Sequence, residues 1–161
     1  MSISKKNLYF KLLFVISLGA LISAYFIEII LGHQPCNLCL IERLPYGLCL
    51  IFIIFYFLFQ KKQRLITLLL IINFMFALII SIYHLGIEQG FFHESFLCNI
   101  DNYTEIMSKE NLLKMLQKKV ISCKDVTFRI FGFSLTTINI ILSLFINIIL
   151  FKIFISYEKN K

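Results

Sequence analysis

The chain has 161 residues, of which 59% are hydrophobic and 16% charged, with 18 phenylalanines and a net charge of +7. Soluble domains are roughly 45–50% apolar and about 25% charged, so these values exclude both an ordinary soluble domain and a disordered chain. The basic residues are scattered over tails and loops, which argues against a nucleic-acid-binding protein. A single membrane domain remains, because a span needs about 20 apolar residues and the chain has room for about four.

Four apolar runs predict an all-α integral membrane protein, a bundle of four transmembrane helices. They cover about residues 8–31, 41–60, 65–85 and 130–155 and leave outer loops at about 32–40 and 86–129. The first run is too long for the core of a cleaved signal peptide. In the long second loop, apolar residues recur at helical spacing from Asn102, and Asn102 with Glu105 forms a capping box. We therefore expect a short amphipathic helix there, on the outer membrane surface or against the ends of the bundle.

The distribution of basic residues predicts the orientation. Nine of the sixteen lie in the two tails and in the short loop at 61–64, where Glu158 is the one acidic residue. By the positive-inside rule these segments, and with them both termini, face the cytoplasm. The two outer loops then share the opposite, oxidising compartment, where disulfides are permitted.

Five cysteines are present, and four of them lie in the outer loops. Cys36 and Cys39 form a CxxC motif in the first loop, while Cys98 and Cys123 belong to the second. A CxxC pair can open and close a disulfide with little backbone movement, and its thiol pKa is often lowered. The fifth, Cys49, lies inside the second span and is expected to be a packed, inert thiol.

Two neighbours of the CxxC motif bear on its reactivity. Cys39 directly precedes a membrane helix, and Arg43 follows four residues later, so the helix dipole and the guanidinium both favour a thiolate. Proline is tolerated best at the first helical position, which indicates that the helix starts at Pro45 and that Arg43 lies just before it.

Three chemistries would use the loop cysteines. In a relay, a pair near the bilayer and a pair in the longer loop pass electrons from a soluble thiol to an acceptor dissolved in the membrane. Because haem, Rossmann and iron–sulfur motifs are absent from the sequence, the acceptor would be a quinone. Arg43 could then donate a hydrogen bond to a carbonyl oxygen of the quinone. Alternatively, purely structural disulfides cross-link the outer loops, or the loop cysteines bind a metal ion with His93 as a further ligand. Zinc prefers ligands in two close pairs, and Cys98 and Cys123 are far apart in sequence.

The motif also supports a resemblance to a known family. Residues 34–46, QPCNLCLIERLPY, resemble the P-C-x-L-C-x-x-x-R signature of the bacterial disulfide bond formation protein B (DsbB) family. YHLGIE at 83–88, the two cysteines of the long loop and FRIFGFS at 128–134 are similar to the same pattern, so the likeness covers about residues 25–147. The resemblance implies a four-helix bundle in the bacterial inner membrane. It also implies the activity of a thiol oxidoreductase that reduces ubiquinone or menaquinone. Its partners would be a periplasmic DsbA-like thioredoxin-fold oxidase, which it reoxidises, and the membrane quinone pool and respiratory chain.

The resemblance also implies a role for each loop cysteine. Cys98 would form the mixed disulfide with the soluble oxidase, and Cys123 would be its partner in a redox-active disulfide. Cys36 would exchange with this loop pair, and Cys39, its own disulfide partner, would be the thiolate that faces the quinone.

Four further residues are candidates near the outer membrane surface. Arg43 corresponds to the family arginine that is associated with quinone. His84 and Glu88, at the end of the third span, either contribute to the quinone site or are plain interfacial polar residues. Glu28 is an acidic residue near the outer end of the first span, and an acid within a membrane span is by default a candidate for function. A carboxylate that reaches toward water would explain it as well.

Overall fold

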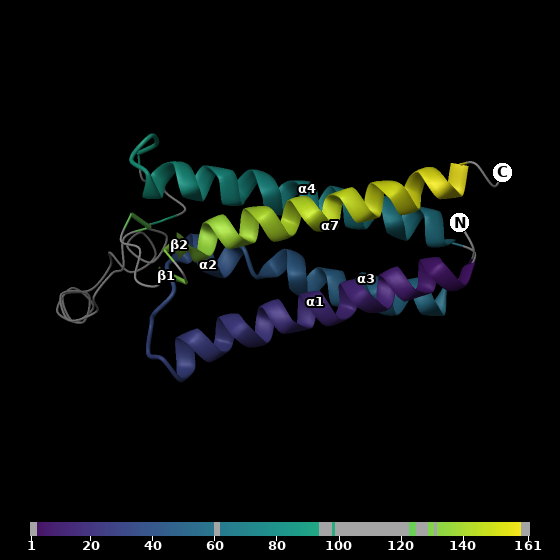
Figure 1. The fold of residues 1–161 in the computed structure, drawn as a ribbon, viewed down its shortest axis with the longest axis horizontal. Coiled ribbons are helices and arrows are strands. Elements are labelled where there is room, and N and C mark those ends of the chain that lie inside the picture. The colour runs from purple at the N-terminus through teal and green to yellow at the C-terminus, as the bar shows by residue number, and fades with distance from the viewer. Residues whose placement is uncertain are drawn as a thin grey trace, which may run out of the picture.

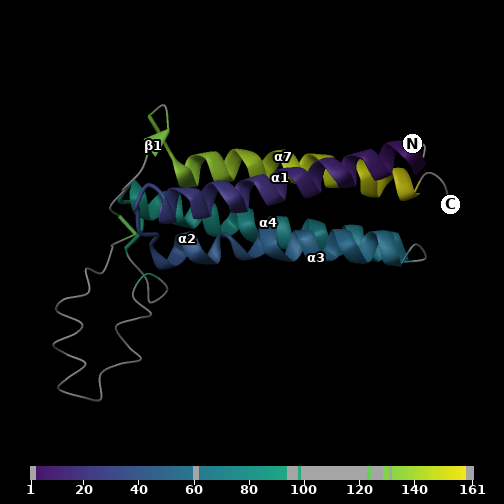
Figure 2. The ribbon, with the colours of Figure 1, turned by 90° about the horizontal axis from the view of Figure 1, so that it is seen from below.

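The computed structural model describes residues 3–59, 62–93, 98, 123–124, 129–130 and 132–158. The long helices lie side by side, with both chain ends at one end of the bundle and the short elements at the other (Figures 1 and 2). The amphipathic helix expected after Asn102 lies outside the described residues. In chain order, the elements are α1 (Ile3–Ile29), α2 (Asn37–Ile41), α3 (Leu44–Leu58), α4 (Gln63–Glu88), β1 (Arg129–Ile130), β2 (Phe133–Ser134) and α7 (Leu135–Glu158).

The predicted four-helix membrane fold is confirmed. Within the described part of the chain, four helical segments are long and apolar enough to cross a membrane: Lys5–Ile29, Asn37–Leu58, Gln63–Glu88 and Leu135–Tyr157. Large apolar side chains cover the outer faces of all four, as lipid contact requires. The chain is therefore a multi-pass membrane protein.

The helix ends differ from the hydropathy runs. The third helix continues past residue 85 to Glu88, so that His84 and Glu88 both belong to it. The fourth helix begins at Leu135 rather than at residue 130, because Arg129–Ile130 and Phe133–Ser134 pair as a small antiparallel hairpin. Gly132 in its turn has a φ of 86°, a conformation that favours glycine. Hydropathy alone does not reveal this turn, because its flanking residues are apolar.

The second span is interrupted just after the CxxC motif. The α2 helix ends at Ile41, and α3 begins at Leu44 with Pro45 in its first turn, as the proline predicts. The chain crosses from α1 to α2 through Gly32, whose φ is 71°. Glu42 and Arg43, between the two helices, keep right-handed helical backbone angles, so α2 and α3 form one span from Asn37 to Leu58.

The main apolar core lies in the half of the bundle nearer the chain ends. It includes Phe10 of α1, Tyr56 of α3, Phe74 of α4 and Leu150 of α7, and Cys49 is fully buried among them. Ser17 donates a hydrogen bond to Cys49 Sγ over 3.3 Å. Cys49 thus packs as a small buried side chain, and it lies in a different cluster from the other cysteines.

Candidate functional site

The CxxC motif lies at the end of the bundle opposite the two chain ends (Figure 1). Cys36 is the N-cap of α2, and its Sγ accepts a hydrogen bond from the Cys39 backbone N–H over 3.3 Å. The two sulfur atoms are 2.8 Å apart. Cys39 therefore lies within α2 and not ahead of the helix, and it is Cys36 that occupies the capping position. The expectation that the helix start favours a thiolate at Cys39 is corrected, because the capping hydrogen bond goes to Cys36.

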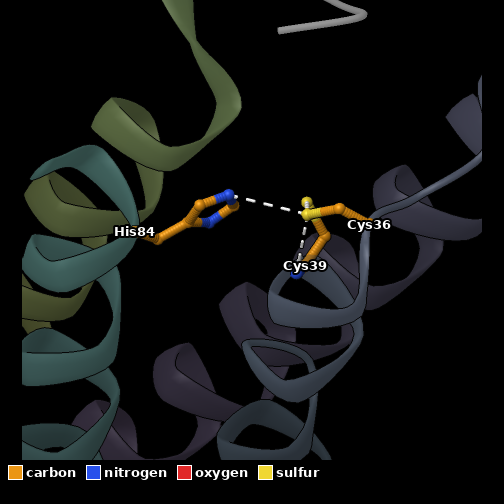
Figure 3. Close-up of side chains that lie close together, drawn as sticks. All are labelled: Cys36, Cys39 and His84. Carbon is orange, nitrogen blue, oxygen red and sulfur yellow. Dashed lines mark hydrogen bonds between the residues drawn. The ribbon is translucent and has the colours of Figure 1, made fainter. Parts of the chain in front are cut away.

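His84 of α4 faces the motif from across the bundle (Figure 3). Its Nε2 lies 3.6 Å from Cys36 Sγ, and its Nδ1 lies 2.9 Å from Glu42 Oε1. The imidazole is 2% exposed, so its two nitrogens find their partners inside the protein. The bundle thus aligns Glu42, His84 and Cys36 in a row, with the imidazole between the carboxylate and the sulfur.

A polar network surrounds His84. Thr136 of α7 donates to Glu88 Oε1 over 2.6 Å and lies 3.3 Å from His84 Nδ1. Asn139 donates to Glu42 Oε2 over 3.0 Å and to Ser81 over 2.8 Å, and it accepts a hydrogen bond from Tyr46. Buried polar groups need such partners, and this network fixes the orientation of Glu42 and His84. Glu88 Oε2 is buried and has no hydrogen-bond partner among the described residues.

The two cysteines of the long loop join the same cluster. Cys98 and Cys123 are each 2% exposed and pack with Cys36, Leu38 and Ile87. Asn37 donates a hydrogen bond to the Cys98 carbonyl over 3.1 Å, which ties the long loop to the CxxC motif. The Cys123 thiol is hydrogen-bonded to Cys36 and to Cys98. The four cysteines that the sequence distributes over two loops therefore meet at one place.

This environment alters the acidity of two of the thiols. Hydrogen bonds from the Cys123 and Cys39 thiols, with a smaller contribution from His84, hold the pKa of Cys36 well below its ordinary range, although burial opposes them. The pKa of Cys123 is raised, because its thiol donates to Cys36 and is buried. Of these two thiols, Cys36 is therefore the one that ionises more readily.

Arg43 pairs with Glu28. Its Nη1 donates a hydrogen bond to Glu28 Oε2, and its guanidinium lies over the ring of Tyr25, 5.0 Å from the centroid. The Glu28 side chain is 32% exposed and at the same time pairs with the arginine next to the site.

A cavity of about 400 Å³ adjoins the cysteines. It lies between α1 and α7, where Ala20, Ser23, Ala24 and Ile27 share one face of α1 at helical spacing and leave room for it. Its walls are mainly apolar, and its polar lining includes Cys36, Cys39, Cys123, Arg43, His84 and Glu88.

The structure therefore brings the four loop cysteines together with the four further candidates. Cys98 belongs to the buried cluster, six of the eight residues line the cavity, and Glu28 pairs with Arg43. Sequence reasoning missed the roles of Glu42, Thr136 and Asn139. Glu42 and Asn139 are polar residues within apolar spans, and that property is the signal that could have identified them.

The fold and this site define a multi-pass membrane protein with a buried cysteine cluster beside an apolar cavity. Residues 6–153 match the family described as "Disulfide bond formation protein DsbB", and the chain belongs to this family. The chain is 29% identical over 151 residues to "Uncharacterized protein RP370" of Rickettsia prowazekii (strain Madrid E), a match that covers 92% of this chain and 88% of that protein. No solved structure matches the chain. Family membership makes it a disulfide-formation membrane protein.

Proposed function

We propose that the protein is a thiol:quinone oxidoreductase of the bacterial inner membrane. It reoxidises a periplasmic thioredoxin-fold dithiol oxidase and passes the electrons through two cysteine pairs to ubiquinone or menaquinone. The observation that carries this proposal is the meeting of Cys36, Cys39 and Cys123 at the lining of one apolar cavity, with Cys98 packed against them. Both termini lie at the opposite end of the bundle, which fits cytoplasmic termini and periplasmic cysteines (Figure 1).

The relay begins in the long loop. The reduced partner attacks Cys98 of the Cys98–Cys123 disulfide, and resolution of the mixed disulfide leaves the partner oxidised and both loop cysteines as thiols. Cys123 then attacks Cys36 of the Cys36–Cys39 disulfide, since its sulfur is hydrogen-bonded to Cys36. Closing the Cys98–Cys123 bond leaves Cys36 and Cys39 reduced. Each exchange moves two electrons and conserves the number of disulfides.

The cavity fits a quinone. Its apolar walls suit a ring with an isoprenoid tail, and the Arg43 guanidinium supplies N–H donors of the kind that carbonyl oxygens accept. When bound there, a quinone would be the final acceptor for the two electrons of the relay, together with two protons. Arg43 would hold the quinone by hydrogen bonding, and the Glu42 carboxylate holds His84 in place. Cys39 lines the cavity, which supports its proposed role as the sulfur that faces the ring.

Quinone reduction by the purified, detergent-solubilised chain tests the proposal. A reduced thioredoxin-fold oxidase is added, and the quinone absorbance is followed. Serine at Cys36, Cys39, Cys98 or Cys123 should abolish turnover, while Cys49→Ala, the matched control in the apolar core, should retain it. A fully active Cys98→Ser protein would refute the relay. An inactive wild type whose loop cysteines resist reductant would indicate structural disulfides instead.

A further inference from the structure

Two sulfur atoms and one ring nitrogen converge beside the cavity. Cys36 Sγ, Cys39 Sγ and an imidazole nitrogen of His84 all lie within 4.8 Å of one another. Zinc binds thiolate sulfur at about 2.3 Å and imidazole nitrogen at about 2.0 Å, so the ligands of a tetrahedral ion lie about 3.5–3.8 Å apart. The 3.6 Å from Cys36 Sγ to His84 Nε2 already meets this requirement. The two sulfurs, at 2.8 Å, would have to separate by about 1 Å.

The surroundings of His84 resemble those of a metal-binding histidine. Such histidines usually donate their second ring N–H to a carboxylate, which fixes the tautomer and the ring orientation. Here Nδ1 lies 2.9 Å from Glu42 Oε1, and Asn139 in turn holds the other oxygen of Glu42. With the proton on Nδ1, the lone pair of Nε2 is directed at Cys36.

Glu88 provides a second, independent observation. Its Oε1 lies 4.0 Å from His84 Nε2, and its carboxyl side chain is 7% exposed. Its Oε2 is buried without a hydrogen-bond partner among the residues that the structure describes. A buried carboxylate oxygen without a partner is costly, and a cation next to it would offset that cost.

We propose that the reduced protein binds one thiophilic divalent cation, of the class of Zn²⁺, through Cys36, Cys39 and His84. The fourth coordination position faces the cavity, which all three residues line. Binding displaces the thiol protons and involves no change of oxidation state. The Cys36–Cys39 disulfide removes both sulfur ligands, so the ion and the disulfide exclude each other. A bound ion would therefore hold the pair reduced and inhibit the oxidase, a consequence that rests on the proposed function.

Metal titration of the full chain in detergent tests the site. The protein is reduced with a phosphine, desalted without oxygen and titrated with Cd²⁺, whose bonds to thiolates absorb in the near ultraviolet. Zn²⁺ affinity is then measured by competition with a chromophoric chelator. The reduced protein should bind one ion, and the oxidised protein should bind none. Comparing these two states of the wild type requires no substitution and so does not depend on whether a variant folds.

Variants identify the ligands. His84→Ala should weaken Zn²⁺ binding at least tenfold, and Glu42→Gln should weaken it about 10- to 100-fold, the usual effect of losing a carboxylate that orients a ligand. Cys49→Ala is the matched control and should bind normally. Equal affinity in the oxidised and reduced proteins, or in His84→Ala and Cys49→Ala, would overturn the proposal.

Quinone turnover, measured with and without a chelator, separates this inference from the proposed function. Zn²⁺ should inhibit turnover, and the chelator should restore it. Turnover by a protein that fails to bind Cd²⁺ when reduced would overturn the metal site alone. One Cd²⁺ bound by a reduced protein that never reduces quinone would support the metal site and count against the proposed function.

Discussion

Arg43 and Glu28 form an ion pair between α3 and α1 at the cavity. The two residues come from different spans, and the Arg43 side chain is 14% exposed while that of Glu28 is 32% exposed. Glu28 therefore offsets the charge of Arg43 beside the proposed quinone site and holds one nitrogen of its guanidinium. The pairing gives Arg43 a structural partner as well as its proposed part in binding.

Replacing Glu28 with glutamine should destabilise the protein. The amide keeps the size of the side chain but removes the charge that Arg43 pairs with, so the free energy of unfolding should fall by about 1 kcal/mol, the upper range for partly exposed pairs. Thermal unfolding in detergent measures it. In a double-mutant cycle with Arg43→Gln, the two losses should be non-additive. Strict additivity would contradict an energetic coupling between the two residues.

Replacing Arg43 with histidine should weaken quinone binding. A hydrogen bond from a charged donor contributes about 1.5–3 kcal/mol, so the apparent KM for quinone should rise about tenfold or more. The rate of thiol exchange with the soluble partner should stay the same, because the exchange takes place at the sulfur atoms. Steady-state kinetics with varied quinone concentration separate the two effects. An unchanged KM would leave Arg43 with only its pairing to Glu28.

The reactivity of Cys36 should persist at acidic pH in the reduced protein. Its lowered pKa keeps the thiolate where an ordinary thiol, with a pKa of about 8.5, is protonated. This thiolate stabilises the reduced fold fully above the ordinary pKa, and the contribution is lost as the pH falls through the lowered pKa. The rate of alkylation of Cys36, followed by peptide mass spectrometry across pH, measures the midpoint.

The Cys123→Ala protein provides the control for that titration. Because the Cys123 thiol is the largest cause of the lowered pKa, its removal should move the Cys36 midpoint upward. Identical titration curves for the two proteins, both at the ordinary thiol midpoint, would contradict the assignment.

Cys49→Ala should cost stability without affecting turnover. Cys49 is fully buried and accepts a hydrogen bond from Ser17, so truncation leaves a small void and an unpaired hydroxyl. We expect a loss of about 1–2 kcal/mol on unfolding, with quinone turnover unchanged. The two measurements are made on the same preparation. A loss of turnover in a folded protein would show that Cys49 takes part in the redox chemistry.

Gly86→Ala should destabilise the end of α4, where the neighbouring Ile87 packs in the cysteine cluster. A Cβ at residue 86 would lie 2.2 Å from a ring carbon of Phe92, and that ring also stacks on Tyr83. The ring must move, and overpacking of this kind typically costs about 1–3 kcal/mol. Gly19→Ala in the middle of α1 is the matched control, because its Cβ meets nothing within 4 Å. That substitution should stabilise the helix by about 0.5–1 kcal/mol. Equal thermal stability of the two variants would refute the contact.

Properties that depend on residues close together along the chain could be predicted from the sequence. The apolar runs identified the four spans because each is long enough to cross a bilayer by itself. The CxxC motif with Arg43 identified the family because its residues lie within one short segment. The hairpin before α7 was not predicted, since Ile130, Phe131 and Phe133 extend the apolar run of the helix that follows.

Only the tertiary structure decided which side chains meet. Cys36 and Glu42 cap the two ends of α2 while His84 belongs to α4, so their alignment depends on how α4 packs beside α2. The pairing of Glu28 with Arg43 depends likewise on the packing of α1 against α3. Hydropathy says only that such polar residues in a membrane protein need partners, because the bilayer offers none. Which partners they find is determined by the rotation and depth of each helix, and these depend on the packing of all the helices together.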